Sequence, residues 1–131
     1  MSSKLGEEAS MDITGLIGQY AHGNEPSHHT TYMYAYSGEH YKIADKVRYI
    51  NNELYTDKPD GLSGNEDCGQ MSAWYILSSM GFYPVNPSNG AYVFGSPLFD
   101  EVVLDIPGQK QFKISAKNNS DKNIYIQSVS L

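Results

Sequence analysis

The fold of this chain is decided by the stretch QMSAWYILSSMG at residues 70–81, which is apolar nearly all round with small residues interspersed. This pattern predicts a buried helix, and Gly81 is the residue type that most often ends a helix in a left-handed conformation. Just before it, residues 56–69 are rich in turn-forming residues and predict a long polar loop. A loop of this kind inside a compact domain is usually functional or disordered.

Upstream of this loop the sequence predicts further helices. Residues 39–55 carry apolar side chains spaced by three and four, which predicts an amphipathic helix with one face toward solvent. Residues 12–22 predict a short helix capped by Asp12, and residues 28–37 predict a helical segment capped by Ser27. The apolar positions of the amphipathic helix are Tyr41, Ile43, Ala44, Val47, Ile50 and Leu54.

Downstream of Gly81 the period changes to that of strands. Four short β-branched and aromatic segments, separated by Gly, Pro and Asn clusters, predict an antiparallel sheet of about four strands. The expected fold class is therefore α+β, with a helical part at residues 1–90 and a strand-rich part at residues 91–131. The four segments are residues 91–95, 101–106, 111–116 and 124–129.

Composition excludes several classes of function. The chain has 131 residues, enough for one domain, and its 40% hydrophobic content is too high for a disordered protein. A net charge of −6 argues against a nucleic-acid partner. No apolar stretch approaches the roughly 18 residues of a membrane helix, so we expect no membrane insertion. Residues 1–8 lack the apolar region of a signal peptide.

Three of the four histidines lie within HGNEPSHH at residues 22–29. His28 and His29 are adjacent and would point about 100° apart on a helix, so the spacing of a helical zinc site is absent. Two interpretations remain open. One histidine could be a hydrogen-bonded core or capping group, or Asn24, Glu25 and one histidine could line a polar pocket.

A second polar cluster, in the loop before residue 70, contains Asn65, Glu66 and Asp67. These side chains supply the hard oxygen ligands that calcium takes, and the flanking glycines let the backbone approach a ligand closely. Asp67 could equally be an acid that caps the following helix and is stabilised by the helix dipole. The single cysteine, Cys68, cannot form an internal disulfide and is most simply a small buried residue.

Four blocks of sequence together resemble glycoside hydrolase family 92, the calcium-dependent, exo-acting α-mannosidases. The blocks are GNEPSHH (23–29), DGLSGNEDCGQMSAWY (60–75), GFYPV (81–85) and GSPLF (95–99), and they occur in the matching order. The resemblance covers roughly residues 12–106 and implies the C-terminal part of the family's catalytic module.

The resemblance implies a fold and a reaction. The helices would belong to an (α/α)6 toroid, followed by a short antiparallel β-sheet region. The parent protein would hydrolyse α-mannosidic bonds of glycans, with α-1,2 linkages expected, and would invert the anomeric configuration. Such enzymes are usually exported, so the expected location is periplasmic or extracellular. The family's general acid lies upstream of the blocks present here.

The resemblance also implies roles for individual residues. Asp67 would be the general base, with Glu66 assisting. Calcium would be the cofactor, held by Glu25, Asn65 and Asp67, and it would engage the hydroxyls of the terminal mannose. The residues implied to line the mannose site are Asn24, Glu25, His28, His29 and Trp74.

The chain is expected to be a fragment of that enzyme, inactive by itself and prone to self-association through uncovered apolar surface. The alternative from the sequence is a non-catalytic carbohydrate-binding module, in which aromatic residues of residues 91–129 hold a glycan without cleaving it. A third possibility is an interaction domain, in which residues 60–70 are simply a solvated loop.

Overall fold

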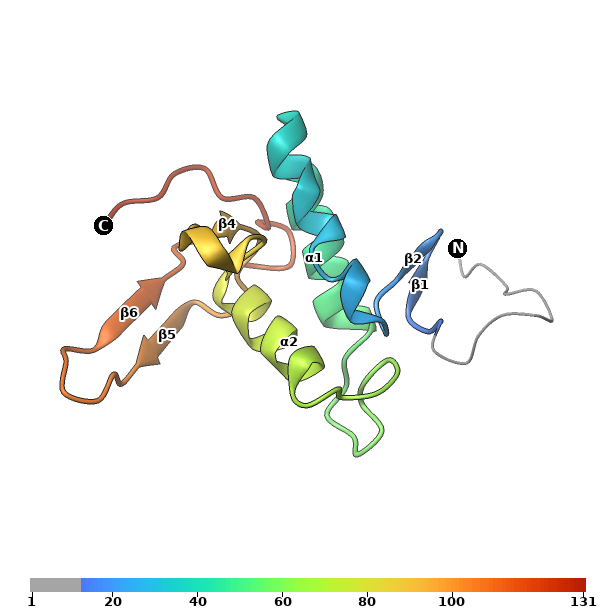
Figure 1. Cartoon of the computed structure of the whole chain (residues 1–131). Helices are drawn as coiled ribbons and strands as arrows, with labels where there is room; N and C mark the ends of the chain where they lie inside the picture. The colour runs from blue at the N-terminus through green and yellow to red at the C-terminus, as the bar shows by residue number, and fades with distance from the viewer. Residues whose placement is uncertain (1–12) are drawn as a thin grey trace.

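The computed structural model describes residues 13–131, and its centre is a pair of helices. Helix α1 spans Tyr41–Glu53 and helix α2 spans Gln70–Met80. Figure 1 shows the two helices beside each other, with a β-hairpin projecting on either side. Both helices agree with the sequence prediction, and Gly81 ends α2 in the left-handed region at φ 99°.

The core lies between these two helices and the segments that cover them. Trp74 of α2 is fully buried, and it packs with the buried face of α1 that the spacing of apolar residues predicted. Ile76 of α2 is 55% exposed, so the predicted burial of this helix nearly all round is wrong on that face. The buried hydrophobic cluster consists of Tyr32, Ile43, Val47, Ile50, Trp74 and Tyr83.

The segment before α1 differs from its prediction. Strands β1 (Leu16–Ile17) and β2 (Tyr20–Ala21) form a hairpin where a helix was expected, with Ile17 opposite Tyr20. Gly18 lies at φ 64°, a left-handed conformation that suits a tight turn and interrupts a helix. The proposed cap Asp12 lies outside the described residues.

Two 3₁₀ helices follow the hairpin. Helix η1 spans Glu25–Ser27 and helix η2 spans Thr30–Ser37. The segment is therefore helical as predicted, but η2 begins after His29 rather than after Ser27, and no side chain caps it. Gly38 ends η2 at φ 78°, and the chain then enters α1.

The strand region forms two separate hairpin-like pairs instead of one sheet. Strand β3 (Phe82–Tyr83) pairs with β4 (Val93–Phe94) around the short helix η3 (Pro87–Asn89). Strand β5 (Glu101–Leu104) pairs with β6 (Phe112–Ser115). Each of the three pairs, β1–β2 included, is an isolated two-stranded antiparallel sheet.

The predicted strand at 124–129 is wrong. This segment is held by side chains instead: Ser96 Oγ donates to the Ile124 carbonyl at 2.7 Å, and Tyr125 Oη donates to Asp45 at 2.7 Å. Its β-branched and aromatic residues carry a strand signal, but among the described residues no neighbouring edge pairs with it. The α+β composition stands, whereas the single sheet of four strands does not.

Candidate functional site: two carboxylates at the head of helix α2

The first part of the site is a short loop closed by two histidines. The Nε2 of His28 donates to the carbonyl of His22 at 3.0 Å, and the backbone N–H of His28 donates to the Glu25 carbonyl at 2.9 Å. Glu25 opens helix η1 in the middle of this loop, and its side chain is half-buried. These two hydrogen bonds close the loop between His22 and His28, and Glu25 lies within it.

The second part is the turn that leads into α2. Asp67, Cys68 and Gly69 are consecutive left-handed residues, at φ 49°, 58° and 92°. Such a conformation is strained for Asp and Cys, which have a Cβ, and strain of this kind is frequently found at functional sites. The backbone N–H of Gln70 donates back to the Asp67 carbonyl at 3.2 Å, which fixes Asp67 at the start of the helix.

Two glycines bring these loops into contact. A Cβ on Gly23 would lie 2.0 Å from Thr14 Oγ1 and 2.8 Å from the Ser63 carbonyl oxygen. A Cβ on Gly64 would lie 2.8 Å from the Gly23 carbonyl oxygen. The two backbones can approach this closely only because neither residue has a side chain.

The side chains of Glu25 and Asp67 meet across this contact. A side-chain hydrogen bond between Glu25 and Asp67 is the main cause that lowers the pKa of Glu25, and a backbone hydrogen bond of Glu25 adds to it. Two carboxyl groups in hydrogen-bond contact share a proton or a cation, because two full negative charges so close repel each other. The structure thus brings the two sequence blocks together at one oxygen-rich point.

Glu66 points elsewhere. Its carboxylate accepts a hydrogen bond from the backbone N–H of Ser72 at 2.9 Å and another from the Ser72 hydroxyl at 2.7 Å. These two bonds lower the pKa of Glu66. The acid that caps α2 is therefore Glu66, whereas the sequence alone made Asp67 a candidate for this role.

His22 and His28 are buried behind the two carboxylates, with 0% and 1% exposure. Burial, with a smaller contribution from the neighbouring His28, lowers the pKa of His22 to about 3. Burial also lowers the pKa of His28, although its hydrogen bond to the His22 carbonyl acts in the opposite direction. Both rings are therefore neutral at pH 7.

The remaining predicted residues lie at varied depths. Trp74 is fully buried and its Nε1 donates to the His28 carbonyl at 3.0 Å, so in this structure it supports the Glu25 loop from behind. Asn24 is half-buried beside Glu25, whereas Asn65 and His29 are exposed. Cys68 is exposed and free, contrary to the expectation that it is buried.

The donor chemistry at this point partly fits a calcium ion. Glu25 and Asp67 supply carboxylate oxygens, and calcium takes six to eight oxygen ligands that include carbonyls and waters. Within residues 13–131, no group of three or more His, Cys, Asp or Glu side chains has metal-binding geometry. The described residues thus bring two carboxylates together here, and a calcium ion at this point would need further ligands, such as carbonyl oxygens or water.

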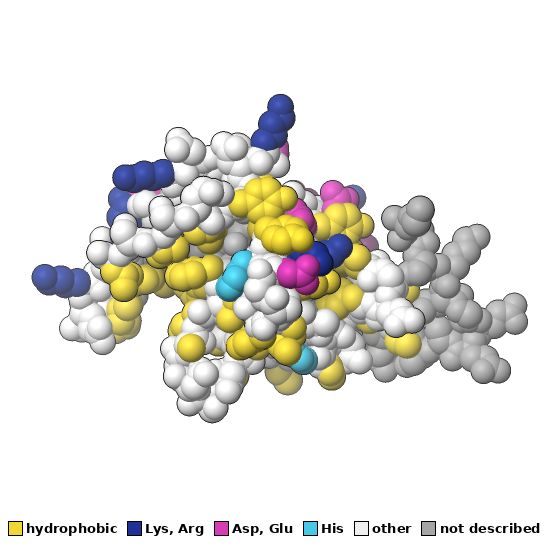
Figure 2. All heavy atoms as spheres, turned by 90° about the horizontal axis from the view of Figure 1, so that it is seen from above, with side chains coloured by type: hydrophobic (Ala, Val, Ile, Leu, Met, Phe, Trp, Pro, Cys, Tyr) yellow, Lys and Arg dark blue, Asp and Glu magenta, His cyan; other side chains and the backbone are white. Residues whose placement is uncertain are grey.

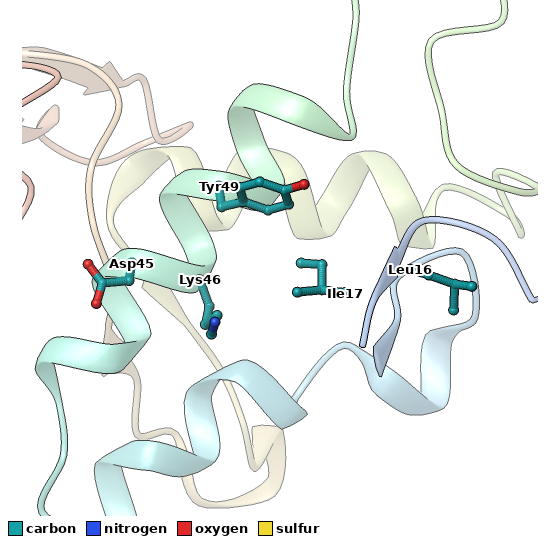
Figure 3. Close-up of a pocket in the computed structure, with 5 residues that line it drawn as sticks. All are labelled: Leu16, Ile17, Asp45, Lys46 and Tyr49. Carbon is teal, nitrogen blue, oxygen red and sulfur yellow. The ribbon is translucent and has the colours of Figure 1, made fainter. Parts of the chain in front are cut away.

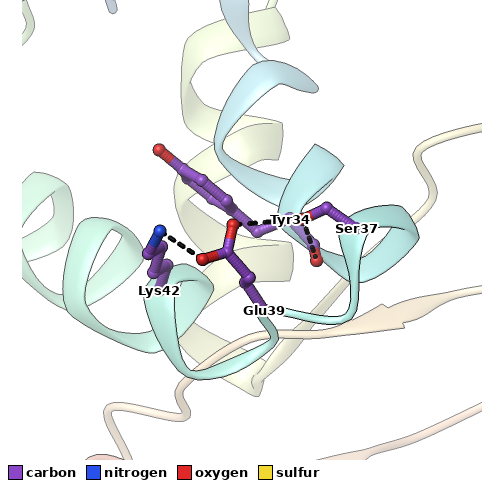
Figure 4. Close-up of polar contacts among 4 residues, drawn as sticks. All are labelled: Tyr34, Ser37, Glu39 and Lys42. Atoms are coloured by element: carbon purple, nitrogen blue, oxygen red, sulfur yellow. Dashed lines mark hydrogen bonds and ion pairs between the residues drawn. The ribbon is translucent and has the colours of Figure 1, made fainter.

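The hollows of the surface lie elsewhere. Figure 3 shows a cavity of about 230 Å³ between α1 and the β1–β2 hairpin, lined by none of the predicted site residues. A larger groove of about 590 Å³ lies beside η2. Ile17 and Lys46 line both this groove and the first cavity. On the rim of that groove Glu39 accepts from Ser37 and pairs with Lys42, whose ammonium lies 5.4 Å from the centroid of the Tyr34 ring (Figure 4). We place the site at the converging carboxylates, because these cavities contain no comparable chemistry.

Four further residues lie near the site, and of these only Tyr20 was considered from the sequence, as an aromatic residue of the core. Tyr20 and Tyr55 hydrogen-bond to the two ring nitrogens of His22, Gln70 lies 3.4 Å from His28 Nδ1, and Ser72 binds Glu66. Gln70 and Ser72 lie in the first turn of α2. Their position directly after the acidic cluster was the sequence feature that could have identified them. Tyr55 had no such signal, because its position beside His22 depends on tertiary packing.

Comparisons with known proteins agree on one family. Residues 2–131 match the model of the glycosyl hydrolase family 92 catalytic domain. A family 92 α-mannosidase from Bacteroides thetaiotaomicron, solved in complex with mannoimidazole, superposes with a TM-score of 0.83 and 47% identity over 88% of this chain. A family 92 inverting mannosidase of the same bacterium gives a TM-score of 0.70 and 48% identity over 79% of this chain.

A curated relative is an uncharacterized secreted glycosidase of the fungus Arthroderma benhamiae, 30% identical over 83% of this chain. The chain spans only 14% of that relative, and 15% and 14% of the two bacterial enzymes. The match of the family model over nearly the whole chain shows that the chain belongs to glycosyl hydrolase family 92.

Proposed function

We propose that this chain forms part of an exo-acting, inverting α-mannosidase that hydrolyses α-mannosidic linkages of glycans, with α-1,2 linkages preferred. The observation that carries the proposal is the hydrogen-bonded contact between Glu25 and Asp67, in a chain that belongs to family 92. The similar enzyme bound to mannoimidazole and the similar inverting mannosidase support the substrate class and the stereochemistry.

In the proposed reaction Asp67 is the general base. Its carboxylate takes a proton from the water that attacks the anomeric carbon, on the face opposite the leaving group. Inversion requires an acid and a base about 6.5–9.5 Å apart so that this water fits between them. The general acid belongs to a part of the enzyme outside the family blocks present here, so the isolated chain is proposed to be inactive.

Glu66 assists indirectly in this proposal. Because Ser72 holds both of its oxygens, Glu66 stabilises the helix start on which Asp67 depends and is not oriented toward a water itself. Asn24 and His29 are proposed to hydrogen-bond the sugar. His28 and Trp74, implied as sugar contacts by the family resemblance, are buried and hydrogen-bonded within the protein, so they are proposed to support the loop that carries Glu25. We also propose that the chain divides into two parts. Residues 1–90 would belong to an (α/α)6 toroid, and residues 91–131 would form the strand-rich C-terminal part.

Calcium is the proposed cofactor, held by Glu25, Asp67 and Asn65 together with ligands from outside the described residues. When bound, the ion supplies positive charge that engages mannose hydroxyls and favours the distorted ring of an oxocarbenium-like transition state. Without a cation, the two carboxyl groups need a shared proton, which would compromise Asp67 as a base.

The proposed location of the parent enzyme is periplasmic or extracellular, supported by the relative described as secreted. In residues 13–131, no helix has the length and apolar character to span a membrane. Self-association of the isolated chain is also proposed. Hydrophobic side chains reach the surface on the face shown in Figure 2, and Val103, Phe112 and Ile76 are each more than 40% exposed.

The test is Asp67→Asn in the full-length protein that contains this chain. We expect kcat on an α-1,2-linked mannobioside to fall about 10²- to 10⁴-fold, the usual contribution of a general base. The product anomer is followed by NMR, which reports inversion directly. Asp57→Asn, in the same loop region but outside the site, is the matched control and should leave kcat unchanged. A full-length enzyme that cleaves no mannoside, or an Asp67→Asn variant with normal kcat, would contradict the proposal.

A further inference from the structure

A network of hydrogen bonds, built around the buried rings of His22 and His28, connects the two parts of the site from behind. His22 is at its centre, and its ring is enclosed by the rings of Tyr20, His28, Tyr55 and Trp74, with centroid separations of 4.4–5.9 Å. The ring is 0% exposed, so each of its nitrogens needs a partner within the protein.

The donors and acceptors of the network fix the state of His22. Tyr55 Oη donates to the Met71 carbonyl at 3.1 Å, so the same oxygen accepts from His22 Nε2 at 2.6 Å. Nδ1 then carries no proton and accepts from Tyr20 Oη at 2.7 Å. His22 is thus neutral with its proton on Nε2. From Tyr20 through His22 and Tyr55 to the Met71 carbonyl, each group donates a hydrogen bond to the next.

The network continues through His28. Its Nε2 donates to the His22 carbonyl, which leaves Nδ1 as the acceptor toward Gln70 Nε2 at 3.4 Å. The His28 carbonyl in turn accepts from Trp74 Nε1 at 3.0 Å. Both ends of the loop that carries Glu25 are therefore tied to the first turns of α2.

These ties bear directly on the position of the two carboxylates. Gln70 and Met71 are the first residues of α2 and follow Asp67 closely, whereas His22 and His28 are the ends of the loop that presents Glu25. The network therefore spans the same two segments as the contact between the carboxyl groups, but on the buried side.

We infer that His22, with Tyr20 and Tyr55, is a positioning residue that sets Glu25 against Asp67 and so prepares the site for the reaction proposed above. The inference rests on the proposed function for its role in catalysis, and on geometry alone for the positioning. An apolar residue of similar volume at position 22 would fill the space but would not direct the loop, because it has neither donor nor acceptor.

The first experiment needs neither calcium nor substrate. It measures the nuclear Overhauser effect between the γ-protons of Glu25 and the β-protons of Asp67 in this chain. We expect His22→Leu and Tyr55→Phe to reduce its intensity at least threefold. His22→Gln, which keeps a side-chain N–H donor toward Tyr55, should restore at least half of the intensity that His22→Leu loses.

Tyr32→Phe is the matched control. The Tyr32 hydroxyl is fully buried and donates to Ser78 at 2.8 Å, but it does not belong to the network. Tyr32→Phe should leave the Overhauser effect between Glu25 and Asp67 unchanged. Because His22→Leu is the variant most prone to unfolding, Tyr55→Phe, which removes one oxygen atom, decides the outcome if His22→Leu does not fold by circular dichroism.

The second experiment measures kinetics in the full-length protein. Tyr55→Phe should lower kcat about 10- to 100-fold, the usual effect of an outer residue that orients an active group, with KM changed less than threefold. An unchanged Overhauser effect in folded Tyr55→Phe, or equal losses in Tyr32→Phe, would overturn the inference. A wild-type chain that binds neither calcium nor mannose would count against the proposed function and leave the Overhauser result intact.

Discussion

Ser72 binds both carboxylate oxygens of Glu66, one through its backbone N–H at 2.9 Å and the other through its hydroxyl at 2.7 Å. This pairing separates two adjacent acids that have similar chemistry. Glu66 is engaged with its own helix, whereas the neighbouring Asp67 reaches Glu25 on another loop. Two acids next to each other in sequence thus have different tasks, because consecutive side chains at a helix start point in different directions.

The first prediction follows from this separation. Glu66→Gln should lower Tm by a few degrees and reduce kcat of the full-length enzyme less than about tenfold, because it weakens a cap and keeps the base. Asp67→Asn should show the reverse, with a large loss of kcat and little change in Tm. Differential scanning calorimetry and initial rates on the same preparations check both. Equal kinetic losses in the two variants would show that Glu66 also takes part in the chemistry.

The second prediction concerns pH. Burial lowers the pKa of His22 from 6.5 to about 3, so between these values the unfolded chain holds a proton that the folded chain does not. Stability contributed by neutral His22 is therefore complete above pH 6.5 and is lost as the pH falls toward 3. At about 1.4 kcal/mol per pKa unit, the loss has an upper limit of about 5 kcal/mol.

The groups that face His22 are Tyr20, Tyr55 and His28, and the two tyrosines stay neutral over this range because burial raises the pKa of each. Urea unfolding at pH 7.5, 6 and 5 measures the slope. His22→Gln should flatten it, whereas His40→Gln, on the exposed surface, should not. A slope that is the same in wild type and His22→Gln would mean that other groups cause the acid instability.

Much of this arrangement could be anticipated from the sequence, and each element that was predicted wrongly has a physical reason. The spacing of apolar residues identified α1 because one face of that helix is buried in a regular pattern. Gly81 marked the end of α2 because only a residue without a Cβ takes φ 99° without strain. The strand predicted at 124–129 was wrong because that segment is held by the side chains of distant residues, Ser96 and Asp45. The helix predicted at 12–22 was wrong because Gly18 takes a left-handed conformation and turns the chain into a local hairpin.

The site shows the same division. Its residue types and their order along the chain indicated the acidic and histidine clusters, and the family resemblance indicated that they meet. The hydrogen bonds that distinguish Glu66 from Asp67, and the place of Tyr55 behind His22, depend on three-dimensional packing. No local pattern at Tyr55 encodes a partner 33 positions away.

A third prediction tests the glycine contact. Gly23→Ala should destabilise the chain by about 1–3 kcal/mol, the usual cost of overpacking, because its Cβ would lie 2.0 Å from Thr14 Oγ1. Thr14→Ala in the same chain removes that atom and should recover part of the loss. The destabilisation that remains in the double variant would come from the clash of the new Cβ with the Ser63 carbonyl oxygen, 2.8 Å away. Chemical denaturation of the two single variants and the double variant provides the cycle. A fully additive cycle would show that Thr14 and Gly23 do not touch.

The fourth prediction concerns the C-terminal segment. Arg48 of α1 donates to Ser96 Oγ at 3.1–3.2 Å, to the Pro97 carbonyl at 2.6 Å and to Asn119 Oδ1 at 2.9 Å. The planar guanidinium reaches all three acceptors at once, and Lys cannot copy this fork. Arg48→Lys should therefore cost about 1–3 kcal/mol and raise amide exchange in residues 116–131. Lys46→Arg on the same helix is the control. Unchanged exchange in Arg48→Lys would show that the segment is held mainly by Tyr125 and Ser96.

The last prediction tests the cation directly. The two carboxyl groups of Glu25 and Asp67 meet in the described part of the chain without a third acidic or histidine ligand, so calcium should bind the isolated chain weakly, with a Kd of about 10⁻⁴–10⁻³ M. Glu25→Gln and Asp67→Asn should each weaken binding at least tenfold, because each removes half of the negative charge that attracts the ion. Glu53→Gln, on the exposed end of α1, keeps the site intact and serves as the control for a nonspecific effect of net charge.

Isothermal titration at pH 7.5 and pH 5 checks the dependence on ionisation, and binding should weaken at the lower pH because protons compete with the ion for the same oxygens. Equal affinities in wild type and both site variants would show that calcium, if bound, is held by other oxygens, and the pairing of Glu25 with Asp67 would then need a shared proton instead of a cation.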